Sequence, residues 1–141
     1  MLAKKITAVF GEDLTGRVFT LWGLAFKPGT DDMREAPSIE LVRELTERGA
    51  VIQAYDPQAI KTAQHFYLKG VKGIDYVDNK YDALNGADAM VVVTEWKEFQ
   101  SPDFMEIAAR MKGSHIFDGR NIYRAEIVAQ HGLHYHQIGV R

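Results

Sequence analysis

The sequence of 141 residues contains no cysteine. This absence excludes disulfides, thiolate zinc sites and a catalytic thiol within these residues. Neither sign of charge dominates, since 17 lysines and arginines stand against 19 aspartates and glutamates, for a formal net charge of −2. Such a balance gives no indication of a surface for nucleic acid or for a membrane, so we expect neither as a partner.

Long apolar runs are also missing, and no segment is apolar enough over sufficient length to span a bilayer as a helix. The first residues, MLAKKITAVFGEDL, lack the continuous apolar core and the cleavage site of a secretory signal. We therefore expect a cytoplasmic protein. The length fits one domain, and 46% hydrophobic with 26% charged residues is typical of globular chains.

What the sequence does have is a regular alternation of short apolar runs and longer amphipathic ones. Strands that alternate with helices indicate crossover units and a parallel sheet, with right-handed connections. The predicted fold class is α/β, a Rossmann-like three-layer sandwich with a mostly parallel sheet of five or six strands. The expected strands are 18–26, 51–55, 74–77, 89–93, 115–117 and 133–138, and the expected helices are 2–10, 38–48, 58–68, 79–85, 102–111 and 122–131.

Unusual polar residues collect where these strands end. Lys27 and Arg34 follow the first predicted strand, and Arg120 follows the fifth. In open parallel sheets, ligands bind beyond the carboxyl ends of the strands. Arginine can grip a phosphate or carboxylate with two hydrogen bonds, and lysine acts as a point charge. The sequence therefore predicts a site for an anionic ligand at this edge.

The segment WGLAFKPGTDDMREAP, residues 22–37, forms the first of these strand ends. It contains no G-x-G-x-x-G, because Gly23 and Gly29 are six residues apart, so the pyrophosphate of NAD would lack its usual glycine turn. Pro28 fixes its own φ and biases the preceding residue away from helix. A stiff loop would hold Phe26 against a base or sugar and Lys27 near a charged or hydroxyl oxygen.

Each cation also has a structural interpretation. Lys27 fits a solvated loop lysine. Arg34 fits a helix-entry arginine paired with Asp31 or Asp32, two residues that we interpret as turn or capping residues. Arg120 fits a salt bridge within its own turn. Both interpretations of each cation stay open at this point.

Asp56 follows the second strand, where a ribose-binding acid would stand in a dinucleotide fold. Without the glycine fingerprint, we favour a turn role before Pro57.

Three histidines near the end of the sequence, His131, His134 and His136, invite a zinc interpretation, and the last two share a strand face. No carboxylate or thiol accompanies them at ligand spacing, and a catalytic zinc needs three protein ligands. We therefore expect no metal site.

Several motifs occur in one order along the chain. They are WGLAFKP from residue 22, TDDMR from residue 30, APS from residue 36, YDP from residue 55, TEW from residue 94 and FDGRN from residue 117. In this order they resemble the UDP-glucose/GDP-mannose dehydrogenase family, most closely the bacterial UDP-glucose 6-dehydrogenases. The resemblance covers essentially the whole chain.

The resemblance extends only to the C-terminal, UDP-binding domain of that family. It implies that residues 17–141 form this domain and that residues 1–16 are the end of a linking helix. Family members oxidise UDP-glucose twice with NAD to UDP-glucuronate, through a thiohemiacetal and a thioester on a cysteine. That cysteine and the glycine fingerprint belong to the family's other domains, so we expect this chain alone to be inactive.

The resemblance also implies roles for single residues. Phe26 and Lys27 correspond to residues that contact the nucleotide sugar, and Arg120 to the arginine that holds the substrate. Arg34 corresponds to the arginine that reaches the cofactor pyrophosphate. Full-length members are usually homodimers. Two alternatives remain: a free-standing, non-catalytic nucleotide-binding module, or the same domain from a dehydrogenase of GDP-mannose or a UDP-N-acetyl sugar.

Overall fold

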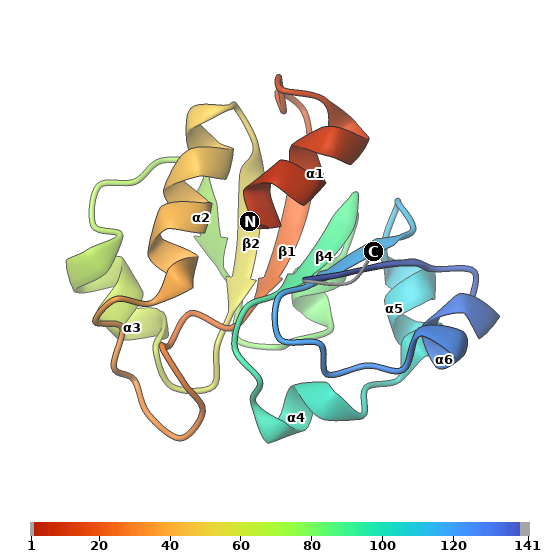
Figure 1. Cartoon of the computed structure of the whole chain (residues 1–141). Helices are drawn as coiled ribbons and strands as arrows, with labels where there is room; N and C mark the ends of the chain where they lie inside the picture. Colours follow the sequence, from red (N-terminus) through yellow and green to blue (C-terminus); the bar gives the residue numbers. More distant parts are fainter. Residues whose placement is uncertain (1, 139–141) are drawn as a thin grey trace.

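Six parallel strands form the centre of the computed structural model, which describes residues 2–138 (Figure 1). Their order across the sheet is β3-β2-β1-β4-β5-β6, and every neighbouring pair is parallel. This confirms the predicted fold class. The strands are β1 (Val18–Trp22), β2 (Val51–Tyr55), β3 (Ile74–Tyr76), β4 (Ala89–Val92), β5 (His115–Asp118) and β6 (His134–Gln137).

Helical segments cover both faces of the sheet. Neighbouring residues of a strand point to opposite faces. On β1, Phe19 meets the ring of Phe10 edge-on at 5.3 Å, whereas Thr20 donates a hydrogen bond to the carbonyl of Ala83. The segment that carries Phe10 and the segment that carries Ala83 therefore lie on opposite faces of the sheet. The segments are α1 (Leu2–Phe10), α2 (Pro37–Glu47), α3 (Ile60–Thr62), the π-helical turn η1 (Ala63–Tyr67), the 3-10 turn η2 (Asp82–Leu84), α4 (Lys97–Gln100), α5 (Phe104–Arg110) and α6 (Ala125–Gln130).

Helix α1 is an integral part of this packing. It lies beside α2 and packs over β5, with Ala3 and Ile6 buried (Figure 1). The division of the chain at residue 16 stays a prediction. Within residues 2–138, no helix is long and apolar enough to cross a membrane.

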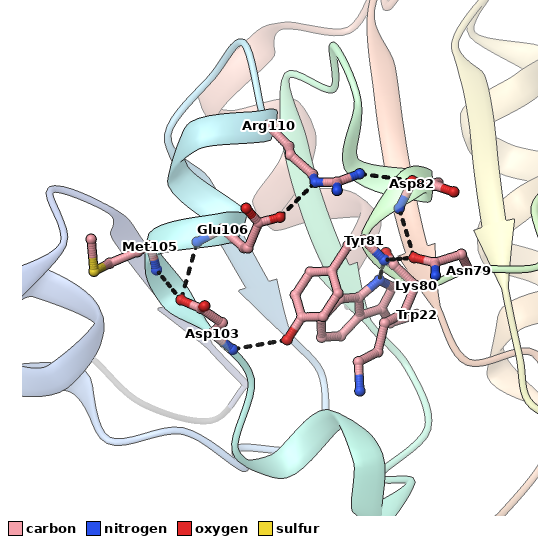
Figure 2. Close-up of polar contacts among 9 residues, drawn as sticks. All are labelled: Trp22, Asn79, Lys80, Tyr81, Asp82, Asp103, Met105, Glu106 and Arg110. Carbon is pink, nitrogen blue, oxygen red and sulfur yellow. Dashed lines mark hydrogen bonds and ion pairs between the residues drawn. The ribbon is translucent and has the colours of Figure 1, made fainter.

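Figure 2 shows a polar network that links η2 to α5. This network lies on the sheet face opposite α1. The Asp103 carboxylate caps α5 by accepting from the backbone of Met105 and Glu106. The Asp103 backbone N–H donates to the Tyr81 hydroxyl at 2.9 Å. Because Asp103 caps the helix, α5 begins at Phe104 and not at the predicted residue 102. The Arg110 guanidinium joins Asp82 and Glu106, each at 2.8 Å.

Other predicted boundaries differ from the structure for local reasons. The first strand ends at Trp22 and not at residue 26, because Gly23 takes a φ of +106° that no strand continues. The predicted helix 58–68 is α3 followed by the π-helical turn η1. The predicted helices 79–85 and 122–131 shorten to η2 and α6, and α4 was not predicted. Trp22 is fully buried, as expected of a core residue.

Candidate functional site

A buried aspartate organises the carboxyl edge of the sheet. Asp56 follows β2 and is 2% exposed. One carboxylate oxygen holds the loop after β1 and the loop after β4, and the other holds the turn after β2. The predicted turn role is thus confirmed, and the structure adds the two longer-range ties. The five donors are the backbone N–H groups of Leu24, Ala25, Gln58 and Ala59 and the indole N–H of Trp96, at 2.7–3.1 Å.

Two hydroxyls add further anchors to the loop after β1. Thr94 donates to the carbonyl of Ala25 at 2.7 Å, and Ser38 donates to the carbonyl of Leu24 at 2.6 Å. Both hydroxyls are buried, so these hydrogen bonds are shielded from water. The backbone that leads to residue 26 is therefore fixed by contacts from α2 and from the loop after β4.

Phe26 and Lys27 stand on this fixed backbone with exposed side chains. Phe26 is 49% exposed, and its backbone N–H donates to the carbonyl of Asp32 at 2.8 Å. Within residues 2–138, the Lys27 ammonium makes no hydrogen bond or ion pair. An exposed aromatic ring beside an unpaired cation suits a ligand that has a flat or sugar-like part and a negative charge.

Arg34 forms an ion pair within the same loop. Its Nη2 lies 2.8 Å from Asp32 Oδ2, and its Nε also donates to that carboxylate. Hydrogen bonds from the Arg34 side chain lower the pKa of Asp32 to about 2. Of the two acids considered for Arg34, Asp32 is the partner, while Asp31 accepts from the Thr62 hydroxyl. The guanidinium stays highly exposed, so the pairing leaves it accessible.

The loop after β5 is organised by a second buried aspartate, Asp118. Its carboxylate accepts from the backbone N–H groups of Arg120, Asn121 and Ile122, each at 2.8 Å. It also accepts from the Tyr135 hydroxyl at 2.6 Å. Burial, with this hydrogen bond second, raises the pKa of Tyr135. The start of the loop that carries Arg120 is therefore rigid.

The Arg120 side chain does not pair within its own turn. Its Nε and Nη2 donate to one oxygen of Glu95, which follows β4, at 3.1 and 2.6 Å. The interpretation of a salt bridge within the turn was wrong, because Asp118 is occupied by backbone donors. Sequence reasoning assigned Glu95 no partner. The TEW motif was the available signal, since it puts an acid after a buried strand.

The predicted site residues thus lie on one edge of the sheet. Phe26, Lys27 and Arg34 belong to the segment after β1, and Arg120 follows β5. Only β4 separates these two strands, so their ends are about 10 Å apart. The chain has no cysteine to act as a nucleophile. This edge can therefore bind and orient an anionic ligand through Lys27, from the segment after β1, and Arg120, from the loop after β5.

The histidines form a stack on the sheet face that α1 covers. His115 of β5 stacks on His134 and His136 of β6, with ring centroids 4.9 and 5.2 Å apart. The shared face of the two β6 histidines is thereby confirmed. His115 Nδ1 and His136 Nε2 are 2.9 Å apart, so one ring donates a hydrogen bond to the other. Within the described residues, no three histidines or carboxylates are arranged to hold a metal ion.

This stack predicts that acid lowers stability. Burial lowers the pKa of His115 and of His136 from 6.5. The neighbouring imidazoles lower both pKa values further, and Lys5 lowers that of His136. The unfolded chain therefore binds protons more readily, and the free energy of unfolding falls as the pH drops below about 6.5. Urea unfolding at about pH 7.5 and about pH 5.5 measures this. A His136→Gln variant is expected to have a flatter pH dependence, and an equal slope in both proteins would contradict the assignment.

Comparisons with known proteins find matches along most of the chain. Residues 20–125 match the model of the UDP-glucose/GDP-mannose dehydrogenase family, UDP binding domain. The chain is 41% identical over 138 residues to a UDP-glucose 6-dehydrogenase of Rhizobium meliloti and 42% identical over 141 residues to one of Pseudomonas aeruginosa. These matches cover 98% and 99% of this chain but 31% of each relative.

A solved structure shows the same fold. The structure of a UDP-glucose dehydrogenase from the hyperthermophilic archaeon Pyrobaculum islandicum matches with a TM-score of 0.73 and 30% sequence identity. The match covers 89% of this chain and 26% of that one. The chain thus spans between a quarter and a third of the length of these proteins.

Proposed function

Since the chain belongs to the UDP-glucose/GDP-mannose dehydrogenase family, we propose that it is the C-terminal, nucleotide-sugar-binding domain of an NAD-dependent UDP-glucose 6-dehydrogenase. The complete protein would convert UDP-glucose and two NAD to UDP-glucuronate. The observation that carries the proposal is the family match together with Phe26, Lys27 and Arg120 on one edge of the sheet. The chain's role is to complete the substrate site.

The charges and shapes of these side chains suit a nucleotide sugar. A diphosphate carries negative charge that the Lys27 ammonium and the Arg120 guanidinium complement. The exposed Phe26 ring offers a flat apolar surface for the sugar or base. Both flanking loops are fixed by buried aspartates, so binding orders little backbone and loses little entropy.

The residues of this chain do not form a complete binding site for NAD. No glycine fingerprint follows β1, and Asp56, the position of a ribose-binding acid, is filled by five protein donors. The exposed Arg34 is the residue that we propose contacts the cofactor, which the rest of a longer protein would hold. NAD supplies the hydride acceptor when bound. The dimer expected of the full-length protein also stays a prediction.

Replacing Arg120 by alanine is expected to weaken UDP-glucose binding by at least about tenfold, because a charged hydrogen-bond donor to the ligand is lost. Amide NMR titration of the isotopically labelled chain measures this, with shifts at Phe26, Lys27 and residues 118–121. Arg124→Ala, which removes an exposed arginine on the N-terminal side of α6, is the control and should bind as wild type. Equal binding by the Arg120 variant would overturn the assignment.

The same titration separates the alternatives. Tighter binding of GDP-mannose or of a UDP-N-acetyl sugar than of UDP-glucose would point to a related dehydrogenase. Binding of free UDP as tightly as UDP-glucose would favour a module that reads only the nucleotide. The proposal predicts that UDP-glucose binds more tightly than all three.

The purified chain is expected to form no NADH from UDP-glucose and NAD. The oxidation of an aldehyde to an acid through an acyl intermediate requires a nucleophile that forms and releases the acyl group. The chain has no cysteine for this step. Absorbance at the NADH band over hours of incubation measures it, and steady NADH formation proportional to protein concentration would contradict the proposal.

A further inference from the structure

Glu95 is held in place by both of its neighbours in the chain. The Thr94 hydroxyl donates to the carbonyl of Ala25, and the Trp96 indole donates to the Asp56 carboxylate. Both neighbours are buried, whereas Glu95 is intermediate in exposure. The backbone of Glu95 is therefore pinned on either side, and the carboxylate has a defined starting point from which it reaches Arg120.

The contact between Glu95 and Arg120 uses one side of the guanidinium. Nε and Nη2 both donate to Oε2 of Glu95. A guanidinium has five N–H donors. The two on Nη1 and the second on Nη2 are engaged by no group within the described residues. Arg120 can therefore hold Glu95 along one edge and a ligand along the other.

The second oxygen of Glu95 reinforces this view. Oε1 is buried and has no hydrogen-bond partner within residues 2–138. A buried carboxylate oxygen without a partner is unfavourable, because it gives up hydrogen bonds to water and receives none in return. If the ion pair served only stability, both carboxylate oxygens of Glu95 would be expected to accept hydrogen bonds. The geometry therefore favours a role in which Glu95 fixes the position of the Arg120 side chain.

We propose that Glu95 is a positioning residue, which holds the Arg120 guanidinium in the orientation that receives the nucleotide sugar. This inference rests on the proposed function for its ligand. Its geometric part, the ordering of Arg120 by Glu95, does not. The competing role is a shielding charge, in which Glu95 neutralises Arg120 and repels an incoming diphosphate.

Two substitutions separate these roles. Glu95→Gln keeps an acceptor oxygen at the same reach and removes the charge, whereas Glu95→Ala removes both. For a positioning residue, the Arg120 Nε–H stays ordered in wild type and in Glu95→Gln and becomes mobile in Glu95→Ala. UDP-glucose binding then weakens about tenfold in Glu95→Ala and changes by less than about twofold in Glu95→Gln. A shielding charge gives tighter binding in both variants.

The measurement is the ¹⁵N heteronuclear NOE of the arginine Nε–H groups, combined with the UDP-glucose titration. The chain offers a matched control, because Arg124 Nε donates to one oxygen of Glu126 at 2.8 Å and Nη2 forms an ion pair with the same oxygen at 2.8 Å. Glu126→Ala should loosen Arg124 and leave the Arg120 signal unchanged.

Two results would overturn the inference: an Arg120 Nε–H that remains ordered in Glu95→Ala, or tighter binding by both Glu95 variants. If wild type binds no UDP-glucose at millimolar concentration, the proposed function fails for this chain by itself. The ordering of the Nε–H then decides the inference alone.

Discussion

Replacing Asp56 by alanine is expected to lower the free energy of unfolding by about 3–5 kcal/mol. The carboxylate is buried and accepts from five donors. Alanine leaves these donors inside the protein with no acceptor, and each unsatisfied group costs up to a few kcal/mol where water cannot reach it. Partial entry of water keeps the total below the sum.

Asp56→Asn refines this expectation. The asparagine keeps one acceptor oxygen, but its NH₂ group faces N–H donors on the other side. We therefore expect a loss nearly as large as for alanine, since an opposed donor pair is as unfavourable as a missing acceptor. A loss of less than about 1 kcal/mol for either variant would show that water replaces the carboxylate and that the loops are held by other contacts.

Urea unfolding followed by tryptophan fluorescence measures these losses. Asp75→Ala is a matched control, because Asp75 is exposed on β3 and makes no side-chain hydrogen bond within the described residues. We expect this control to change stability by less than about 0.5 kcal/mol. The difference between the two variants then reports the five hydrogen bonds and not the loss of a negative charge.

The fold could be predicted because the hydrophobic patterns that indicate strands and helices lie within short stretches of sequence. Strand β4, Ala89–Val92, is entirely buried and reads in sequence as an unbroken apolar run. The ends of elements were less predictable because they depend on distant partners. Asp56 ties Leu24 and Trp96, which lie 32 and 40 residues away in sequence. The hydrophobic periodicity of a sequence carries no information about hydrogen bonds between residues so far apart.

The candidate site could also be predicted in part: its location was predictable, but the partner of Arg120 was not. The rule that ligands meet the carboxyl ends of parallel strands placed Lys27, Arg34 and Arg120 on one edge. It did not select the carboxylate that each arginine meets. Arg34 pairs with an acid two residues away, while Arg120 pairs with Glu95, which follows the neighbouring strand β4. The first pairing was readable from the sequence, and the second required the order of the strands.

Replacing Gly23 by alanine is expected to lower the free energy of unfolding by about 3 kcal/mol or more. Gly23 ends β1 with a φ of +106°, which L-residues rarely adopt. A Cβ at this position would lie 2.5 Å from the backbone nitrogen of Thr94. Thr94 cannot move away easily, because its hydroxyl donates a hydrogen bond to the carbonyl of Ala25 and the preceding strand β4 is buried on both faces. The backbone strain at residue 23 and the steric overlap of the new Cβ with Thr94 therefore both contribute to the loss of stability.

Gly29→Ala separates these two costs. Gly29 has a φ of +84°, but nothing lies within 4 Å of a Cβ built there. The strain alone should cost about 1–2 kcal/mol, so urea unfolding should show a clearly smaller loss than for Gly23→Ala. Equal losses would mean that β1 and β4 separate at little cost. The close approach of Gly23 to Thr94 would then not be what holds the loop of Phe26 and Lys27 in place. The rigidity of the proposed site would have to come from the hydrogen bonds that Asp56, Ser38 and Thr94 make to this loop.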